Sequence, residues 1–163
     1  MLKISRMSDY AIVLLTAMAR TDATQYTARV LADDTGLTLP TVGKLLKMLS
    51  AGGLLLSQQG RNGGYRLART ANEISLADII EAIDGPIAMT ECFTVDHDCD
   101  REANCGLRPH WQAINQSVRQ LLDSTSLAAL IEPVPQVPVW FNRRPAGAIE
   151  STGKTPRRQA TAQ

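Results

Sequence analysis

The sequence predicts a mainly α-helical protein: a winged helix-turn-helix with a two-stranded wing, followed by a cysteine loop and a long C-terminal helix. Three observations support this fold class. Two helical patterns are separated by a turn at Gly36, a glycine-rich hairpin pattern follows at once, and all three cysteines of the 163 residues lie close together beyond it. The apolar fraction of 44% is enough for a buried core, so a wholly disordered chain is excluded.

The first fifty residues contain three helical patterns. Ser8 is the predicted N-cap of the first helix, and Thr27 is predicted to cap a short second helix that ends at Gly36. Thr38 then precedes a third helix with Pro40 in its first turn, where proline is well tolerated. The predicted apolar stripes comprise, in the first helix, Tyr10, Val13, Leu14, Ala17 and Met18 and, in the third, Val42, Leu45, Leu46 and Leu49.

The turn at 36–38 gives the second and third helices the spacing of a helix-turn-helix, whose second helix enters the major groove of DNA. A plain three-helix bundle would show the same pattern. The next residues favour DNA binding, because strands predicted over 54–57 and 65–68 flank a glycine-rich stretch at 59–64 that suits a tight hairpin wing. Neither G-x-x-x-x-G-K-[ST] nor G-x-G-x-x-G occurs, which excludes the common nucleotide-binding loops.

Charge is divided unevenly along the chain. Residues 1–70 carry nine Lys/Arg against four Asp/Glu, whereas residues 71–130 carry three against ten and residues 131–163 carry five against two. A basic first half attracts a polyanion and an acidic middle repels one, so we expect double-stranded DNA to bind the first seventy residues. The predicted contacts are Thr38, Pro40, Thr41 and Lys44 at the start of the third helix, Arg61 at the wing tip and Tyr65 behind it.

The cysteines follow a fourth helix, predicted over 76–84 with Ser75 as its N-cap. Cys92, Cys99 and Cys105 fall within 14 residues, and this clustering indicates metal or redox chemistry, because core cysteines would be scattered over several elements. Structural zinc sites usually have shorter spacing, whereas iron–sulfur ligation varies more widely. Three thiolates leave a fourth ligand to come from elsewhere. A disulfide switch among the same cysteines is the alternative without a cluster.

The last predicted helix starts around Pro109 and reaches about Leu130. A helix this long in a small DNA-binding protein is expected to pair with its copy, so that a homodimer presents two recognition helices to a palindromic site. Its apolar stripe comprises Trp111, Ile114, Val118, Leu121, Leu122, Leu127, Leu130 and Ile131. Beyond it, five of the eight prolines and few apolar residues predict a disordered tail.

The expected organisation is therefore a DNA-binding domain over 1–86, a cysteine loop over 87–107, a dimerisation helix over 108–131 and a tail over 132–163. No apolar run is long enough to span a membrane and no signal-peptide cleavage pattern occurs, so a cytoplasmic protein without a membrane partner is expected. No nucleophile–base constellation is present, which argues against an enzyme. A small iron–sulfur electron carrier is disfavoured by the DNA-binding half and by the lack of a fourth thiolate.

A family resemblance rests on these motifs taken in order. The sequence S-x-x-S-D-Y-A-x-x-L-L at 5–15, the helix-turn-helix, the wing G-R-N-G-G-Y-R-L-A-R at 60–69 and the cysteine loop resemble the Rrf2 family of iron–sulfur winged-helix regulators over about residues 2–131. The resemblance implies a homodimeric repressor that binds an iron–sulfur cluster, [2Fe–2S] in preference to [4Fe–4S], and controls the SUF cluster-assembly genes. A regulator that senses nitric oxide or a thiol–disulfide change is the alternative function.

The resemblance also implies two candidates for the fourth cluster ligand. Isc-type members of the family place a histidine three residues after the last cysteine, where this chain has Arg108, which cannot ligate; His110 lies two residues further on. NsrR-type members resemble this chain at Asp9, a carboxylate that in that type reaches the partner subunit's cluster. We predict Asp9 in preference to His110. Gly43 stands where Isc-type members have an acidic base-reading residue, so their DNA site is not carried over.

Overall fold

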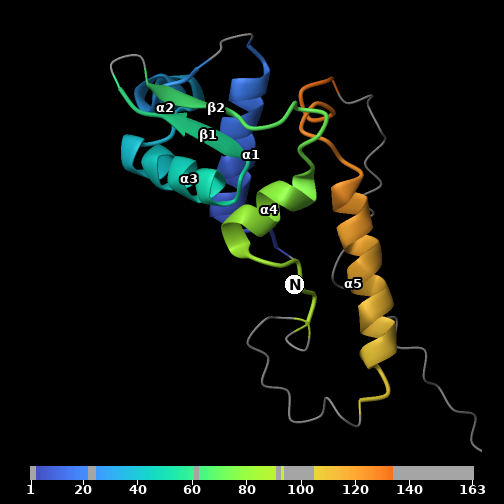
Figure 1. Ribbon diagram of the computed structural model, residues 1–163. Coiled ribbons are helices and arrows are strands. Elements are labelled where there is room, and N and C mark those ends of the chain that lie inside the picture. Colours follow the sequence, from blue (N-terminus) through green and yellow to red (C-terminus); the bar gives the residue numbers. More distant parts are fainter. Residues whose placement is uncertain (1–2, 22–24, 61–62, 91–92, 94–104, 134–163) are drawn as a thin grey trace, which may run out of the picture.

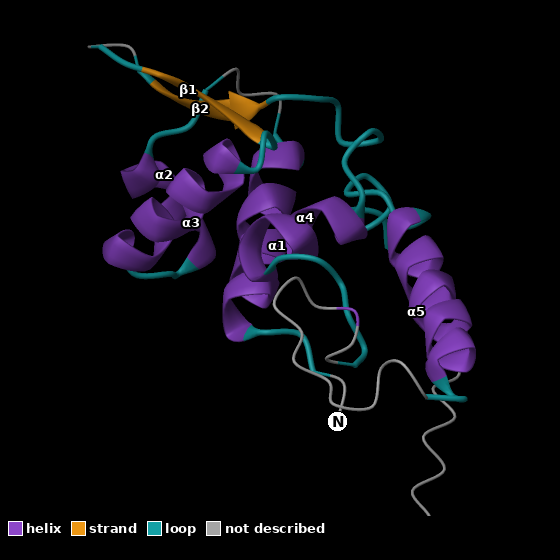
Figure 2. Cartoon of the chain, turned by 60° about the horizontal axis from the view of Figure 1, so that its bottom comes forward, coloured by secondary structure: helices purple, strands orange, loops and turns teal. Residues whose placement is uncertain are grey.

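Five helices and a two-stranded sheet make up a computed structural model that describes residues 3–21, 25–60, 63–90, 93 and 105–133 (Figure 1). The fold is mainly α and has the predicted winged-helix order. The elements are α1 (Arg6–Ala19), α2 (Ala28–Thr35), α3 (Leu39–Ala51), β1 (Leu55–Gln58), β2 (Gly64–Leu67), α4 (Leu76–Asp84) and α5 (Arg108–Asp123). Figures 1 and 2 show the wing beside α2 and α3, and α5 running along one side of the molecule next to α4.

The first helix begins earlier than predicted. Ser5 is its N-cap, with the Ser5 hydroxyl oxygen accepting the N–H of Ser8 at 3.0 Å. Ser8 is fully buried, and its hydroxyl donates to the carboxylate of Asp84 at the end of α4, at 2.7 Å. The prediction of Ser8 as N-cap is wrong: Ser8 lies inside the helix, where its N–H is the group that Ser5 caps. The buried stripe also differs: Leu15 is fully buried, whereas Val13 is 40% exposed.

The helix-turn-helix forms as predicted. The Thr27 hydroxyl caps α2, which ends at Gly36 with a left-handed φ of 69°. The Thr38 hydroxyl caps α3, which carries its proline in the first turn. The predicted apolar face of α3 is fully buried, comprising Val42, Leu45, Leu46 and Leu49.

The wing is an antiparallel pair in which Leu55 lies opposite Leu67 and Gln58 lies opposite Gly64. Its strands are offset by at most one residue from the prediction. Of the wing glycines in the described residues, Gly60 has a positive φ of 115°, whereas Gly64 is needed for a different reason. A Cβ at Gly64 would stand 2.7 Å from the carbonyl oxygen of Tyr26, which pairs with the wing at that point.

The fourth helix packs against α1 and α3. Ser75 and Asp78 form a capping box, in which each side chain accepts the other residue's backbone N–H. Nearby, hydrogen bonds from Thr70 lower the pKa of Glu73 below its ordinary value. The fully buried core residues are Ala11, Leu14, Leu15, Leu31, Val42, Leu45, Leu46, Leu49, Ile74, Ala77, Ile79 and Leu127.

The last helix is shorter than predicted. It ends at Asp123 rather than near Leu130, because the hydroxyls of Ser124 and Thr125 both donate to the carbonyl of Leu121 and the chain then turns back. The N–H of Leu127 donates to the carbonyl of Ile74 at 2.8 Å, and the Leu127 side chain enters the core. Leu127 therefore does not belong to the α5 stripe. Among the described residues, no helix has the length and hydropathy to cross a membrane.

Candidate nucleic-acid interface and cysteine segment

The start of α3 presents the predicted DNA contacts on one exposed end of the helix. Thr38, Pro40 and Lys44 are exposed, and Thr41 is half-buried beside them. The hydroxyl oxygens of Thr38 and Thr41 lie 2.8 Å apart and are hydrogen-bonded to each other. Arg61, the predicted wing-tip contact, lies outside the described residues. The structure thus brings four of the six predicted DNA contacts together on one surface.

Tyr65, one of the predicted DNA contacts, has a structural role in the wing. Its backbone N–H and carbonyl pair with the carbonyl and N–H of Tyr26 at 2.8 and 2.9 Å, and its side chain packs against the core. Arg69, which follows the wing, pairs with Asp78 at 3.1 Å and with the carbonyl of Glu73 at 3.0 Å. Arg69 therefore stabilises the start of α4. Arg66, by contrast, is exposed on β2.

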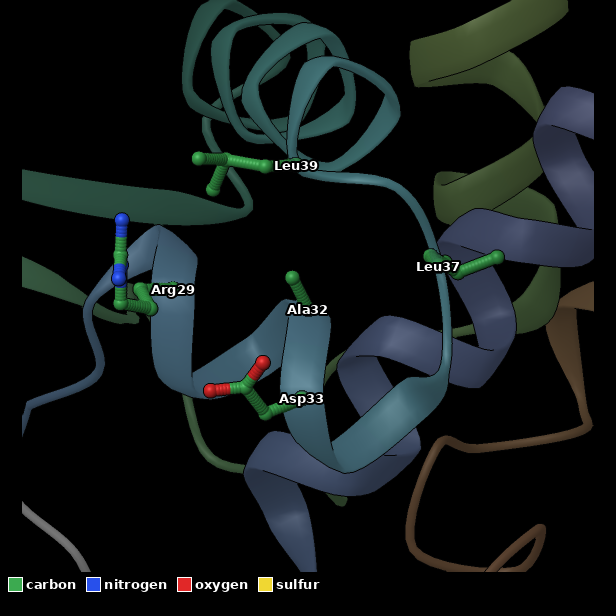
Figure 3. A pocket seen from close by; sticks show the side chains of 5 residues that line it. All are labelled: Arg29, Ala32, Asp33, Leu37 and Leu39. Atoms are coloured by element: carbon green, nitrogen blue, oxygen red, sulfur yellow. The ribbon is translucent and has the colours of Figure 1, made fainter.

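A small pocket lies between α2 and the start of α3 (Figure 3). Arg29 and Asp33 line it from α2, and Leu39 lines it from the first position of α3. The side chains of Arg29 and Leu39 are both exposed here. The exposed cations of α2 and α3 are Arg29, Lys44 and Lys47, which agrees with the predicted basic surface for a polyanion.

The cysteines lie between α4 and α5, in residues 92–105, here called the cysteine segment. Its approach is held by Asn115 of α5: the side-chain oxygen accepts the N–H of Met89 at 3.0 Å, and the side-chain nitrogen donates to the carbonyl of Ile87 at 3.1 Å. Its exit leads directly into α5, with the carbonyl of Cys105 accepting the N–H of Arg108 at 3.2 Å. Residues just before the cysteine segment and its last residue, Cys105, are therefore hydrogen-bonded to α5.

Two further contacts connect the end of α4 to other helices. Arg119 of α5 pairs with Glu81 through two hydrogen bonds at 3.0 and 3.3 Å, and this hydrogen bonding raises the pKa of Arg119 above its ordinary value. Asp84 accepts the hydroxyls of Ser5 at 2.8 Å and Ser8 at 2.7 Å, at the N-terminus of α1. The residues before the cysteine segment are thus joined both to α5 and to the first helix of the DNA-binding half. Asn115 and Asp84 were not predicted.

The predicted ligands are only partly within the described residues. Cys105 is half-buried with a free thiol, as a ligand requires, whereas Cys92 and Cys99 lie outside the described residues. Asp9 is exposed in the first turn of α1, and His110 is exposed in the first turn of α5. Over the part of the chain that the structure describes, no three His, Cys, Asp or Glu side chains gather as a metal site. The ligand set therefore stays a prediction.

The outer face of α5 is apolar and uncovered. Trp111, Ile114 and Leu121 are 37%, 43% and 68% exposed, and no residue of this helix is buried. Together with Val118 they follow each other at spacings of three, four and three residues. This spacing is typical of a helix that packs along a second helix.

Comparison with known proteins identifies the family. The model of the Rrf2 family, described as an iron-dependent transcriptional regulator, matches residues 4–133. A protein of Mycobacterium tuberculosis named as an HTH-type transcriptional regulator is 31% identical over 142 residues, which cover 83% of this chain and 88% of that protein.

Solved structures support the same family. CymR of B. subtilis, titled the global cysteine regulator, is 29% identical with a TM-score of 0.62, over 80% of this chain and 97% of that one. IscR of T. potens is 25% identical with a TM-score of 0.58, over 80% and 86%. The relatives are transcriptional regulators rather than enzymes, and the chain belongs to the Rrf2 family of winged-helix transcriptional regulators.

Proposed function

We propose that this protein is a cytoplasmic, homodimeric repressor whose binding to promoter DNA responds to an iron–sulfur cluster, and that it controls the SUF cluster-assembly genes. The observation that carries the proposal is the clustering of all three cysteines in one segment of the sequence, which residues hydrogen-bonded to α5 precede and end. The description of the family as iron-dependent and the similarity to IscR support the choice of iron.

The proposed ligands are the thiolates of Cys92, Cys99 and Cys105, with the carboxylate of Asp9 from the partner subunit as the fourth. The free, half-buried thiol of Cys105 and the soft donor set fit iron in a [2Fe–2S] cluster. Such a cluster supplies a charge and a coordination that oxidants or nitric oxide change. The chain supplies the response: Asn115 fixes the residues before the cysteine segment to α5, and Asp84 joins them to α1.

The homodimer is proposed to form along α5. Its exposed apolar residues lie on a helix that contacts the rest of the described chain mainly through α4. Burial of this face against a second copy would remove that apolar surface from water. The two α3 helices would then serve as recognition helices for the two halves of a palindromic site.

The experiment that tests this function uses full-length protein purified without oxygen. We expect visible absorbance, about two iron and two sulfide per chain for [2Fe–2S], and a mass in solution twice the 17.7 kDa of one chain. Binding to the promoter of the SUF genes should change when the cluster is removed by oxygen or nitric oxide. Stoichiometric zinc in place of iron would exclude the cluster.

A thiol–disulfide switch is the second candidate, favoured by the similarity to the cysteine regulator CymR and by the free thiol of Cys105. The same measurement separates the two candidates. Colourless protein without iron, whose DNA affinity changes reversibly with a thiol oxidant and a reductant, would select the disulfide switch.

The wing is proposed to contact DNA through Arg61, so Arg61→Ala should weaken binding to specific and random DNA alike. Removal of one phosphate contact lowers the slope of log affinity against log salt by roughly 0.9. Fluorescence anisotropy at several salt concentrations measures both quantities. Unchanged affinity and unchanged slope would show that the wing tip lies away from DNA. Arg69→Ala is the matched control, because Arg69 is already paired with Asp78.

A further inference from the structure

The first turn and a half of α3 lacks charged and amide side chains. From Thr38 to Gly43 the sequence contains no Arg, Lys, Asn, Gln, Asp or Glu, the residue types that make charged or bidentate hydrogen bonds with base edges. The hydroxyls of Thr38 and Thr41 are hydrogen-bonded to each other, and Val42 is fully buried. The exposed apolar side chains at this end are Leu39 and Pro40.

Leu39 differs from the other leucines of α3. It is 45% exposed, whereas Leu45, Leu46 and Leu49 are fully buried. An exposed leucine does not gain the stabilisation that burial of its side chain would provide. Leu39 lines the pocket shown in Figure 3 together with the exposed Arg29, so its surroundings combine an apolar contact with a cation suited to a phosphate.

Gly43 lies one turn after Leu39, on the same side of the helix. Its φ is negative and a Cβ at this position would meet nothing within 4 Å, so neither backbone conformation nor packing within the described chain requires a glycine. Glycine nevertheless destabilises a helix interior relative to alanine. A missing side chain next to Leu39 leaves room for another molecule to approach the helix closely.

We propose that Leu39 contacts the C5-methyl group of a thymine in the major groove and that Gly43 lets α3 approach the base pairs closely enough for this contact. The thymine methyl is the apolar group on the major-groove edge of the base pairs, and apolar side chains read it. Lys44 and Lys47, both exposed further along α3, flank this contact with positive charge. The proposal rests on the DNA-binding part of the proposed function and is independent of the cluster.

The test begins with selection of binding sites from random duplex DNA by full-length protein, with and without its cluster. Each thymine of the selected site is then replaced by deoxyuridine, which lacks only the methyl group. At one thymine in each half-site, we expect this change to weaken binding by wild-type protein about fourfold, which is the loss of one buried methyl group converted to affinity. In Leu39→Ala the same replacement should have no effect.

Ile4→Ala is the matched control, because Ile4 is also exposed, at 49%, but lies outside the helix-turn-helix. It should keep the fourfold effect of deoxyuridine. Gly43→Ala should resist urea better than wild type and bind the selected site about tenfold more weakly, whereas a purely structural glycine would lower stability when replaced.

The outcomes distinguish a failure of DNA binding from a failure of the methyl contact. If no sequence is enriched in the selection, DNA binding itself fails. If a site is enriched but no deoxyuridine replacement has an effect that depends on Leu39, the methyl contact is wrong and the proposed function stands. Wild-type affinity in Gly43→Ala would overturn the close approach of the helix.

Discussion

Leu127→Ala is expected to destabilise the folded chain by about 2–5 kcal/mol, the usual cost of truncating a fully buried leucine. Leu127 is fully buried in the core that α1, α3 and α4 share, although it lies in the turn after α5. Its backbone N–H bonds to the carbonyl of Ile74, so the turn is fixed in place and has little freedom to close the cavity. Urea unfolding followed by circular dichroism measures the loss.

Leu130→Ala is the control for this prediction. Leu130 lies three residues further on and is only half-buried, so its truncation should cost less than half as much. A continuous helix to residue 130 would instead place Leu127 and Leu130 on one stripe with similar surroundings. Equal losses in the two variants would therefore contradict the turn that the structure places after Asp123.

The DNA-binding half was predictable because its signals are local. The Thr27 side chain caps the start of α2, and the left-handed backbone of Gly36 ends it. Both features depend on only a few neighbouring residues. The same is true of Thr38 at the start of α3 and of the capping box at Ser75. The periodicity of α3 identified its buried face without error.

The errors arise where a distant residue decides the local structure. In S-x-x-S, either serine can cap a helix; Ser5 does so, and the hydroxyls of both serines donate to Asp84, which lies 76 residues away from Ser8. The apolar stripe of α5 continues in the sequence beyond Asp123, but backbone pairing of Leu127 with Ile74 ends it. Neither partner is visible in a local pattern.

The candidate site divides in the same way. The exposure of Thr38 and Lys44 follows from the periodicity of α3 and was predictable. The roles of Asn115 and Asp84 depend on which backbone and hydroxyl groups come near them in three dimensions. A single Asn or Asp in an amphipathic helix gives no signal of such a role.

The second large effect concerns the cysteines. Cys92→Ser, Cys99→Ser and Cys105→Ser should each remove most of the visible absorbance and iron, because a hydroxyl replaces a thiolate ligand. The helix content and the dimer should be unchanged, since the described core contains no cysteine. Full iron content in any one variant would exclude that cysteine as a ligand. Ser57→Ala, at an exposed wing position, is a control for handling and reconstitution.

The fourth ligand completes this prediction, and Asp9 is proposed over His110 because it lies on the first helix of the DNA-binding half. Asp9 projects from the first turn of α1, which Asp84 holds through Ser5 and Ser8, whereas His110 is exposed on α5. A partner cluster that binds Asp9 would therefore restrain the first helix of the DNA-binding half, and loss of the cluster would release it. Reconstituted Asp9→Ala should lose its cluster faster in air and respond less to cluster loss in promoter binding, while His110→Ala should behave as wild type. The reverse pattern would assign the ligand to His110, and wild-type behaviour of both variants would exclude both side chains.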